Sequence, residues 1–146
     1  MKVGVSDLKS RAQSGKSIYR MANYYRDLGK NLDTTLSQFF DFVRNIPFEE
    51  DPLLAEITSR PLYLLDRVKF PALDCKKKAV LMGAWFNAHN IPWRLVAVSE
   101  KPDKQPHHVF TQAKIEGEWR AIDPTYPHYM LFEPKKMVTY AEELPR

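Results

Sequence analysis

Hydrophobic residues recur every three or four positions in two segments near the N-terminus, which is the spacing of one face of a helix. The first segment, residues 17–28, ends at Gly29, and the second follows Asp33, a candidate N-cap residue. The hydrophobic positions are Ile18, Met21, Ala22, Tyr25 and Leu28 in the first segment and Leu36, Phe39, Phe40 and Val43 in the second. The pattern therefore predicts two amphipathic helices, the second ending at Ile46 and Pro47.

The middle of the chain predicts three further helices. Residues 48–52 (FEEDP) are typical of a turn, and residues 53–68 predict two short helices, the second opened by Pro61. Residues 74–90 predict the longest helix, because Asp74 is a suitable N-cap and Asn90 precedes Ile91-Pro92, which cannot continue a helix. Its body is apolar on nearly all sides, so we expect it to be buried.

After Pro92 the pattern changes to that of strands. Residues 93–98 predict one strand and residues 99–106 a loop, and two more strands at 107–115 and 118–123 flank a two-residue turn at Glu116-Gly117. Helices come first in the chain and antiparallel strands follow. This order predicts an α+β fold.

Composition and charge exclude several classes of protein. The chain has 146 residues, of which 44% are hydrophobic, enough for one domain with a single core. The net charge is +4, but the lysines and arginines are spread along the whole chain instead of clustering, so no specific nucleic-acid partner is expected. The longest apolar stretch, AVLMGAWF, is far shorter than the ~18–20 residues of a membrane span.

The chain contains one cysteine, Cys75, which cannot form an internal disulfide. A free thiol favours a reducing compartment, so we expect a cytoplasmic protein; packaging in a virion or export without a leader would leave the same sequence. With Asp74 as N-cap, Cys75 is the first residue of the long helix, where backbone N–H groups and the helix dipole favour a thiolate. Residues 76–78, three lysines expected to be exposed, add weak positive potential. The alternative is a small buried hydrophobic residue, the usual role of a free cysteine.

A histidine and an aspartate on the predicted hairpin are candidate partners for this thiol. If Ile115 lies opposite Glu118, then Asp123 faces Phe110, and His108 is its diagonal neighbour on the same sheet face, ~7–8 Å away. A histidine ring and a carboxylate bridge that distance. Cys75, His108 and Asp123 therefore form a candidate catalytic triad, in which the imidazole accepts and returns a proton and the acid orients it.

Other histidines offer weaker alternatives. His107 points to the opposite sheet face in this register, and His128 follows Asp123-Pro124 in a predicted loop beside Pro127, which makes it the nearest rival base. A zinc site would combine Cys75 with some of His89, His107, His108 and His128. This set lacks the paired spacing that places two ligands on one element, so no metal is expected.

Tryptophans Trp85, Trp93 and Trp119 are predicted to be core residues, although Trp119 shares the His108 face and is a candidate wall of the site, together with Phe110.

These residues resemble the transglutaminase-like family, the bacterial and phage branch of the papain-like cysteine enzymes. The resemblance runs through LDCKKKAVLMGAWFNAHNIPWRLVAV, HVF and GEWRAIDPT, which are similar to the family's Asp-Cys helix, "G-I-P-x-R-x-V" strand entry, His-x-aromatic element and "G-x-W-x-x-x-D-P-T" element. It covers residues 70–126, with a fainter likeness of the preceding segment to the helical lead-in of phage-type members and none in residues 1–30. It implies one papain-like domain with a lead-in at 1–68, a catalytic core at 70–126 and a tail at 127–146.

The resemblance also implies roles for individual residues. Cys75 would be the nucleophile, His108 the general base and acid, and Asp123 the orienting acid, with no cofactor. The chain departs from the family pattern where Leu73 replaces a glycine, lysines replace acids after Cys75, and Asn90 stands where a glycine is usual. Lys69 stands where papain-type enzymes keep a glutamine that donates to the oxyanion, so only the backbone N–H of Cys75 is assigned to the oxyanion hole.

The sequence thus predicts a cysteine-dependent acyl-transfer enzyme that acts on amide bonds of a protein or peptide substrate. Hydrolysis is the leading expectation, because no binding site for an acceptor amine is evident in the sequence. Transamidation is the alternative chemistry. A noncatalytic binding or assembly module of a phage particle or on a host protein is the alternative of another class.

Overall fold

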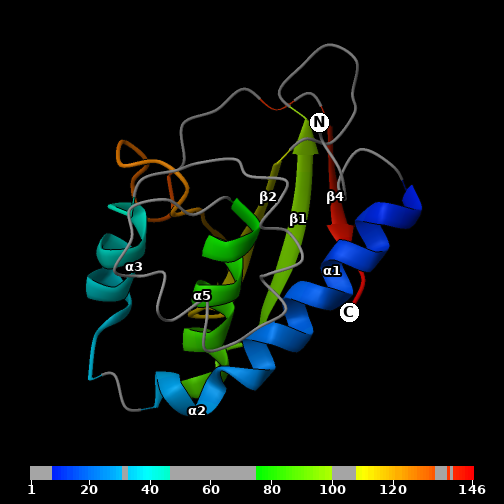
Figure 1. Cartoon of the computed structure of the whole chain (residues 1–146). Coiled ribbons are helices and arrows are strands. Elements are labelled where there is room, and N and C mark those ends of the chain that lie inside the picture. The colour runs from blue at the N-terminus through cyan, green and yellow to red at the C-terminus, as the bar shows by residue number, and fades with distance from the viewer. Residues whose placement is uncertain (1–7, 31–32, 47–74, 100–107, 134–137, 139) are drawn as a thin grey trace.

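The computed structural model of the chain describes residues 8–30, 33–46, 75–99, 108–133, 138 and 140–146 (Figure 1). The helices are α1 (Leu8–Tyr24), α2 (Arg26–Gly29), α3 (Leu36–Arg44) and α5 (Cys75–Ala88), and the strands are β1 (Trp93–Ser99), β2 (His108–Ile115), β3 (Glu118–Ile122) and β4 (Tyr140–Leu144). All strand pairs are antiparallel, in the order β3-β2-β1-β4. Figure 1 shows α1 and α5 side by side in front of the sheet, with α3 next to α5. The predicted α+β fold is confirmed.

The predicted helix at residues 17–28 corresponds to the second part of α1 and to α2, with a break at Tyr25. Helix α1 begins at Leu8, earlier than predicted, and α2 ends at Gly29 as expected. The predicted cap of α3, Asp33, is wrong, because Thr35 is the N-cap residue. The Thr35 hydroxyl accepts a hydrogen bond from the backbone N–H of Gln38 (3.2 Å), and the Gln38 side chain accepts one from the Thr35 N–H (3.0 Å). This reciprocal capping box needs a Gln or Glu three residues after the cap, and Asp33 has Leu36 there.

Helix α5 confirms the prediction of a buried helix, but the prediction that it is the longest is wrong, because α1 has 17 residues and α5 has 14. Asn90 has a left-handed conformation (φ 57°), which ends the helix as a terminal asparagine often does. Every residue from 77 to 86 is buried. This includes Lys77 and Lys78, so the prediction of exposed lysines is wrong for both. Their position on a helix that is covered on nearly all sides outweighs the usual preference of lysine for solvent. The proposed cap Asp74, and the predictions for residues 48–52, 53–68 and 100–107, lie outside the described residues.

The β2–β3 hairpin has the predicted register, with Ile115 opposite Glu118 and Thr111 opposite Ile122. Glu116 and Gly117 form its turn with positive φ angles (53° and 84°), as a two-residue hairpin turn requires. Strand β1 is one residue longer than predicted and includes Ser99. Strand β4, in the C-terminal tail, was not predicted as a strand, because YAEEL consists largely of residues without strand propensity.

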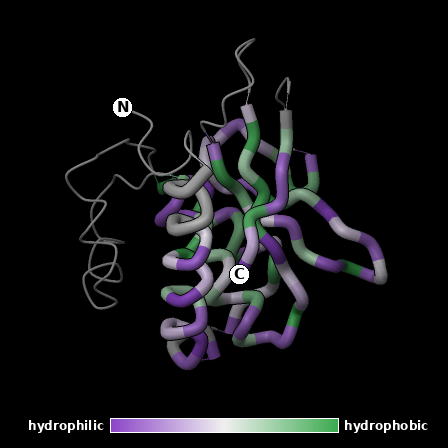
Figure 2. Tube along the Cα trace, turned by 90° about the vertical axis from the view of Figure 1, so that its right-hand side faces the viewer, coloured by the Kyte–Doolittle hydropathy of each residue, from purple (hydrophilic) through white to green (hydrophobic). Residues whose placement is uncertain are grey.

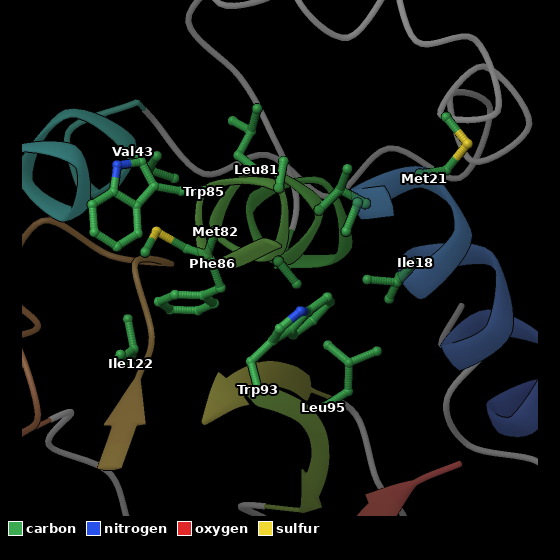
Figure 3. Packing of buried hydrophobic residues seen from close by; sticks show 14 of the residues in the cluster. Ile18, Met21, Val43, Leu81, Met82, Trp85, Phe86, Trp93, Leu95 and Ile122 are labelled. Atoms are coloured by element: carbon green, nitrogen blue, oxygen red, sulfur yellow. The ribbon is translucent and has the colours of Figure 1, made fainter. Parts of the chain in front are cut away.

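The side chain of Trp93, the first residue of β1, points toward α5 and lies at the centre of the core (Figure 3). Ile18 and Leu95 lie on one side of it, and Phe86 and Ile122 on the other. Helix α5 approaches closely at Gly83: a Cβ atom there would lie 2.4 Å from Trp93 Cη2 and 2.9 Å from the Ala22 Cβ. Glycine is therefore required where α1, α5 and Trp93 meet.

Hydrophobic stretches (green) along the strands alternate with hydrophilic residues (purple) in Figure 2. A second, smaller cluster, formed by Val96, Val98 and Phe110, lies on the sheet face opposite the main core, since neighbouring residues of one strand point to opposite faces. Within the described part of the chain, no helix combines the length and the apolar character needed to cross a membrane.

Candidate active site

Cys75 is the first residue of α5, as predicted, and its side chain is partly buried against the main core. The first backbone N–H groups of a helix have no partner within the helix, and the helix dipole adds positive potential at this end. Both effects stabilise negative charge on an atom placed there. The environment of Cys75 therefore suits a thiolate nucleophile, or an oxyanion that forms beside it.

His108 and Asp123 are hydrogen-bonded, although 15 residues separate them in the sequence. His108 Nε2 donates to Asp123 Oδ2 at 2.7 Å, and both residues are buried. The Phe110 ring stacks on the histidine, with 6.0 Å between ring centroids, which limits rotation of the imidazole. The hairpin register thus brings together the base and the acid that the sequence predicted.

His108 also interacts with the Thr125 hydroxyl, 3.5 Å from Nε2, and with the candidate nucleophile. The Cys75 side chain is near enough to the histidine ring for its polar and charge interactions to raise the pKa of His108. Because Nε2 is engaged by Asp123, Nδ1 is the ring nitrogen that remains for the sulfur. His108 therefore lies between a thiol and a carboxylate, which is the arrangement that proton transfer to and from Cys75 requires.

The electrostatic surroundings hold His108 in its charged form. Burial on its own lowers the pKa of the imidazole, but the charge of Asp123, the hydrogen bond to Asp123 and the interactions with Cys75 raise it further than burial lowers it. The net result is a pKa raised from 6.5 to about 10. At neutral pH the ring is therefore an imidazolium that can pair with a thiolate and later supply a proton.

Thr125, a buried residue two positions after Asp123, orients the carboxylate. Its backbone N–H donates to Asp123 Oδ1 at 3.1 Å, and its hydroxyl donates to the same oxygen. The other carboxylate oxygen is left to face His108. Thr125 belongs to the D-P-T motif but was not predicted to be a site residue. An aspartate side chain often accepts a hydrogen bond from the backbone N–H two residues later, and this was the available signal.

Lys78 was also missed as a site residue, because it was expected to be exposed. Its side chain is fully buried, and Nζ donates to the backbone oxygens of Thr125 (2.8 Å), Pro124 (3.1 Å) and Ile46. Burial lowers the pKa of Lys78 to about 8, with the charge of Asp123 opposing the shift, so the ammonium form persists at neutral pH. A lysine one turn into a helix that is apolar on nearly all sides was the available signal for burial.

Trp119, a predicted wall of the site, lies far from His108. It pairs with Lys114, six positions along β2 from His108, which corresponds to ~20 Å at the usual rise of a strand. Trp119 is 39% exposed, and the guanidinium of Arg94 lies over its ring, 4.2 Å from the centroid. Phe110, the other predicted lining residue, does lie beside the histidine.

The other described histidines, His128 and His89, make their ring contacts with residues other than Cys75. His128 is exposed and stacks on Tyr126, with 5.5 Å between ring centroids. His89 follows α5 at the end opposite Cys75, ~20 Å away at the rise of a helix, and stacks on Trp85. His107 lies outside the described residues. Among the residues that the structure describes, no group of three His, Cys, Asp or Glu side chains is arranged to hold a metal ion.

The chain matches no family model and no curated protein by sequence. Its fold is similar to that of a candidate cysteine protease from Cytophaga hutchinsonii, with a TM-score of 0.50 and 18% identity over 86% of this chain. This chain spans about half (47%) of the length of that protein. A candidate protease from Parabacteroides distasonis gives a TM-score of 0.49 at 16% identity over 77% of this chain and 25% of the other. At 18% identity, the similarity to the Cytophaga hutchinsonii protein shows a similar fold and nothing more.

Proposed function

We propose that this protein is a cysteine-dependent acyl-transfer enzyme of the transglutaminase-like type, which hydrolyses amide bonds in a protein or peptide. The observation that carries the proposal is the buried His108, which is hydrogen-bonded to Asp123 and whose pKa is raised by both Asp123 and Cys75. A histidine between a thiol and a carboxylate suits nucleophilic catalysis. A thiol nucleophile must stay reduced, which fits the cytoplasm.

In the first half of the reaction, the Cys75 sulfur attacks the amide carbonyl carbon and forms a tetrahedral intermediate. The negative charge moves to the carbonyl oxygen, and we propose that the backbone N–H of Cys75 donates a hydrogen bond to it. The His108 imidazolium then gives its proton to the amide nitrogen as the carbon–nitrogen bond breaks. The amine leaves, and the acyl group remains on Cys75 as a thioester.

In the second half, neutral His108 takes a proton from water, and the resulting hydroxide adds to the thioester carbonyl. The carbon–sulfur bond breaks, the carboxylic acid is released, and Cys75 and the imidazolium are restored as a pair. Asp123 keeps the imidazole in one orientation through both halves. We propose water as the acceptor because it needs no binding site of its own, whereas transamidation needs a site for an amine.

The experiment that tests this proposal is alkylation of Cys75 by iodoacetamide at about pH 6, where an ordinary thiol, with a pKa of ~8.5, reacts slowly. We expect rapid modification, located at Cys75 by peptide mass spectrometry and slowed at least tenfold or so in His108→Gln. Equal and slow alkylation of both proteins would contradict the proposal. That result would favour a noncatalytic binding or assembly module.

A further inference from the structure

We propose that Lys78 is a positioning residue, which keeps the Asp123 carboxylate directed at His108 by anchoring the two residues that follow Asp123. The proposal rests on the function proposed above. Lys78 does not contact the thiol or the histidine in any interaction seen among the described residues, and it is fully buried. Its action is therefore through Asp123 and not on a substrate.

The anchor consists of hydrogen bonds from one ammonium group to three converging carbonyls. Two of these carbonyls, of Pro124 and Thr125, follow Asp123 directly in the chain, and the third belongs to Ile46, just after α3. An ammonium group has three N–H donors, so each carbonyl receives one. A neutral side chain of similar length, such as methionine, donates none of these bonds.

The anchored backbone is the part of the chain that orients the carboxylate. Thr125 supplies both the N–H and the hydroxyl that hold Asp123 Oδ1. If the Pro124 carbonyl loses its partner, the peptide that it shares with the Thr125 N–H is free to rotate, and this donor to Asp123 moves with it. The Asp123 oxygen that accepts from His108 then loses its fixed direction.

The position of Lys78 in the helix gives the contact a second consequence. Lys78 lies one turn after Cys75 in α5, so the helix that carries the nucleophile also holds the segment that orients the acid. The contacts therefore form a closed path from Cys75 to His108, Asp123, Thr125 and Lys78, and back into α5. A closed path of this kind fixes the separation of thiol and imidazole more tightly than helix packing alone.

The test compares Lys78→Met in two backgrounds, wild type and Asp123→Asn, by the rate constant for iodoacetamide alkylation of Cys75 at about pH 6. If Lys78 acts through Asp123, Lys78→Met slows the reaction about tenfold or more in the wild type and less than about twofold in Asp123→Asn. A purely structural effect would be the same in both backgrounds. Equal slowing in both, or no slowing in the wild type, would overturn the proposal.

Two further variants keep the result interpretable. Ile18 belongs to α1 and packs in the core on the opposite side of Trp93 from Ile122. We expect Ile18→Val to lower the melting temperature and to leave the alkylation rate of Cys75 unchanged. If Lys78→Met does not fold, Lys78→Arg replaces it: the planar guanidinium keeps the charge but does not direct three donors at three converging carbonyls, so the same dependence on Asp123 is expected.

The variant His108→Gln separates the two proposals. If it alkylates as fast as the wild type, the proposed function is wrong. If it alkylates slowly while Lys78→Met remains as fast as the wild type, the proposed function stands and the role of Lys78 is wrong.

Discussion

The two ends of the β2–β3 hairpin carry similar chemistry in opposite surroundings. At one end the His108 ring bonds to Asp123, and both side chains are buried. At the other end Trp119, on the same face by the strand register, is covered by the guanidinium of Arg94, and the indole remains 39% exposed. Each end pairs an aromatic ring with a charged group.

Burial makes the difference between the two ends. Where water is excluded, an ion pair changes the protonation of its members, and the pKa of His108 rises to about 10. Where water has access, the contact of Arg94 with Glu143, at 3.4 Å, is expected to contribute only ~0–1 kcal/mol. The comparison teaches that residue type and sheet face do not by themselves make a reactive site. At the buried end the charges of His108 and Asp123 interact without screening by water, and this interaction raises the pKa of His108.

The largest effect is expected from Asp123→Asn at the buried end. The amide keeps the shape of the carboxylate, but it no longer stabilises an imidazolium and permits the wrong ring orientation. We expect the fold to persist, by circular dichroism, while turnover of a peptide substrate falls by about 10³–10⁴. The matched change at the exposed end, Arg94→Gln, should leave turnover unchanged. Comparable losses in both variants would remove the distinction between the ends.

The next effect is on stability as a function of pH. The pKa of His108 is raised by folding from 6.5 to about 10, so its contribution to stability is complete below pH ~6.5 and is lost as the pH rises through about 10. Each pKa unit corresponds to roughly 1.4 kcal/mol, so we expect a contribution of a few kcal/mol. Urea unfolding should show that the difference in the free energy of unfolding between the wild type and His108→Gln becomes smaller as the pH rises through this range. A difference independent of pH would contradict the raised pKa.

A smaller effect is expected from the two buried threonines of this region. Thr125→Val removes the hydroxyl that donates to Asp123, whereas Thr111→Val removes one that donates to the Ile122 carbonyl at 2.7 Å. Both substitutions should destabilise the protein by about 1 kcal/mol. Only Thr125→Val should slow the alkylation of Cys75, by roughly tenfold, because the Thr125 hydroxyl contacts both Asp123 and His108, whereas the Thr111 hydroxyl contacts neither in the bonds described. Equal alkylation rates would show that the Thr125 hydroxyl does not orient the acid.

The smallest effect is expected at the exposed end itself. Trp119→Leu removes the ring beneath Arg94, and a cation–π contact at an exposed site contributes about 0.5–1 kcal/mol. Thermal unfolding should show a decrease of that size in the free energy of unfolding, and the alkylation rate of Cys75 should not change. A loss of Cys75 reactivity would mean that the exposed end communicates with the site.

Local sequence signals were sufficient for the hairpin and for the helix that carries the thiol. The register of His108 and Asp123 follows from the Glu116-Gly117 turn, because a two-residue turn fixes every later pair. The end of α5 follows from Asn90 before Ile91-Pro92. In these places the determining interactions lie close together in the sequence.

Interactions between distant segments were not predictable in the same way. Strand β4 forms because β1 offers it a free edge, and nothing in YAEEL itself predicts a strand. The burial of Lys78 depends on carbonyls 32, 46 and 47 positions away. Trp119 was expected near the site because it shares the face of His108, but periodicity gives the face and not the position along the strand.

The central claim, that His108 is a buried imidazolium held between Asp123 and Cys75, is tested most directly by NMR titration of the histidine side chains. The chain has 4 histidines, and the signal of His108 is identified by its absence in His108→Gln. We predict that this ring stays protonated through neutral pH and titrates near pH 10, and that its pKa falls in Asp123→Asn. Titration of His108 near pH 6.5 in the wild type, with no change in Asp123→Asn, would contradict the account.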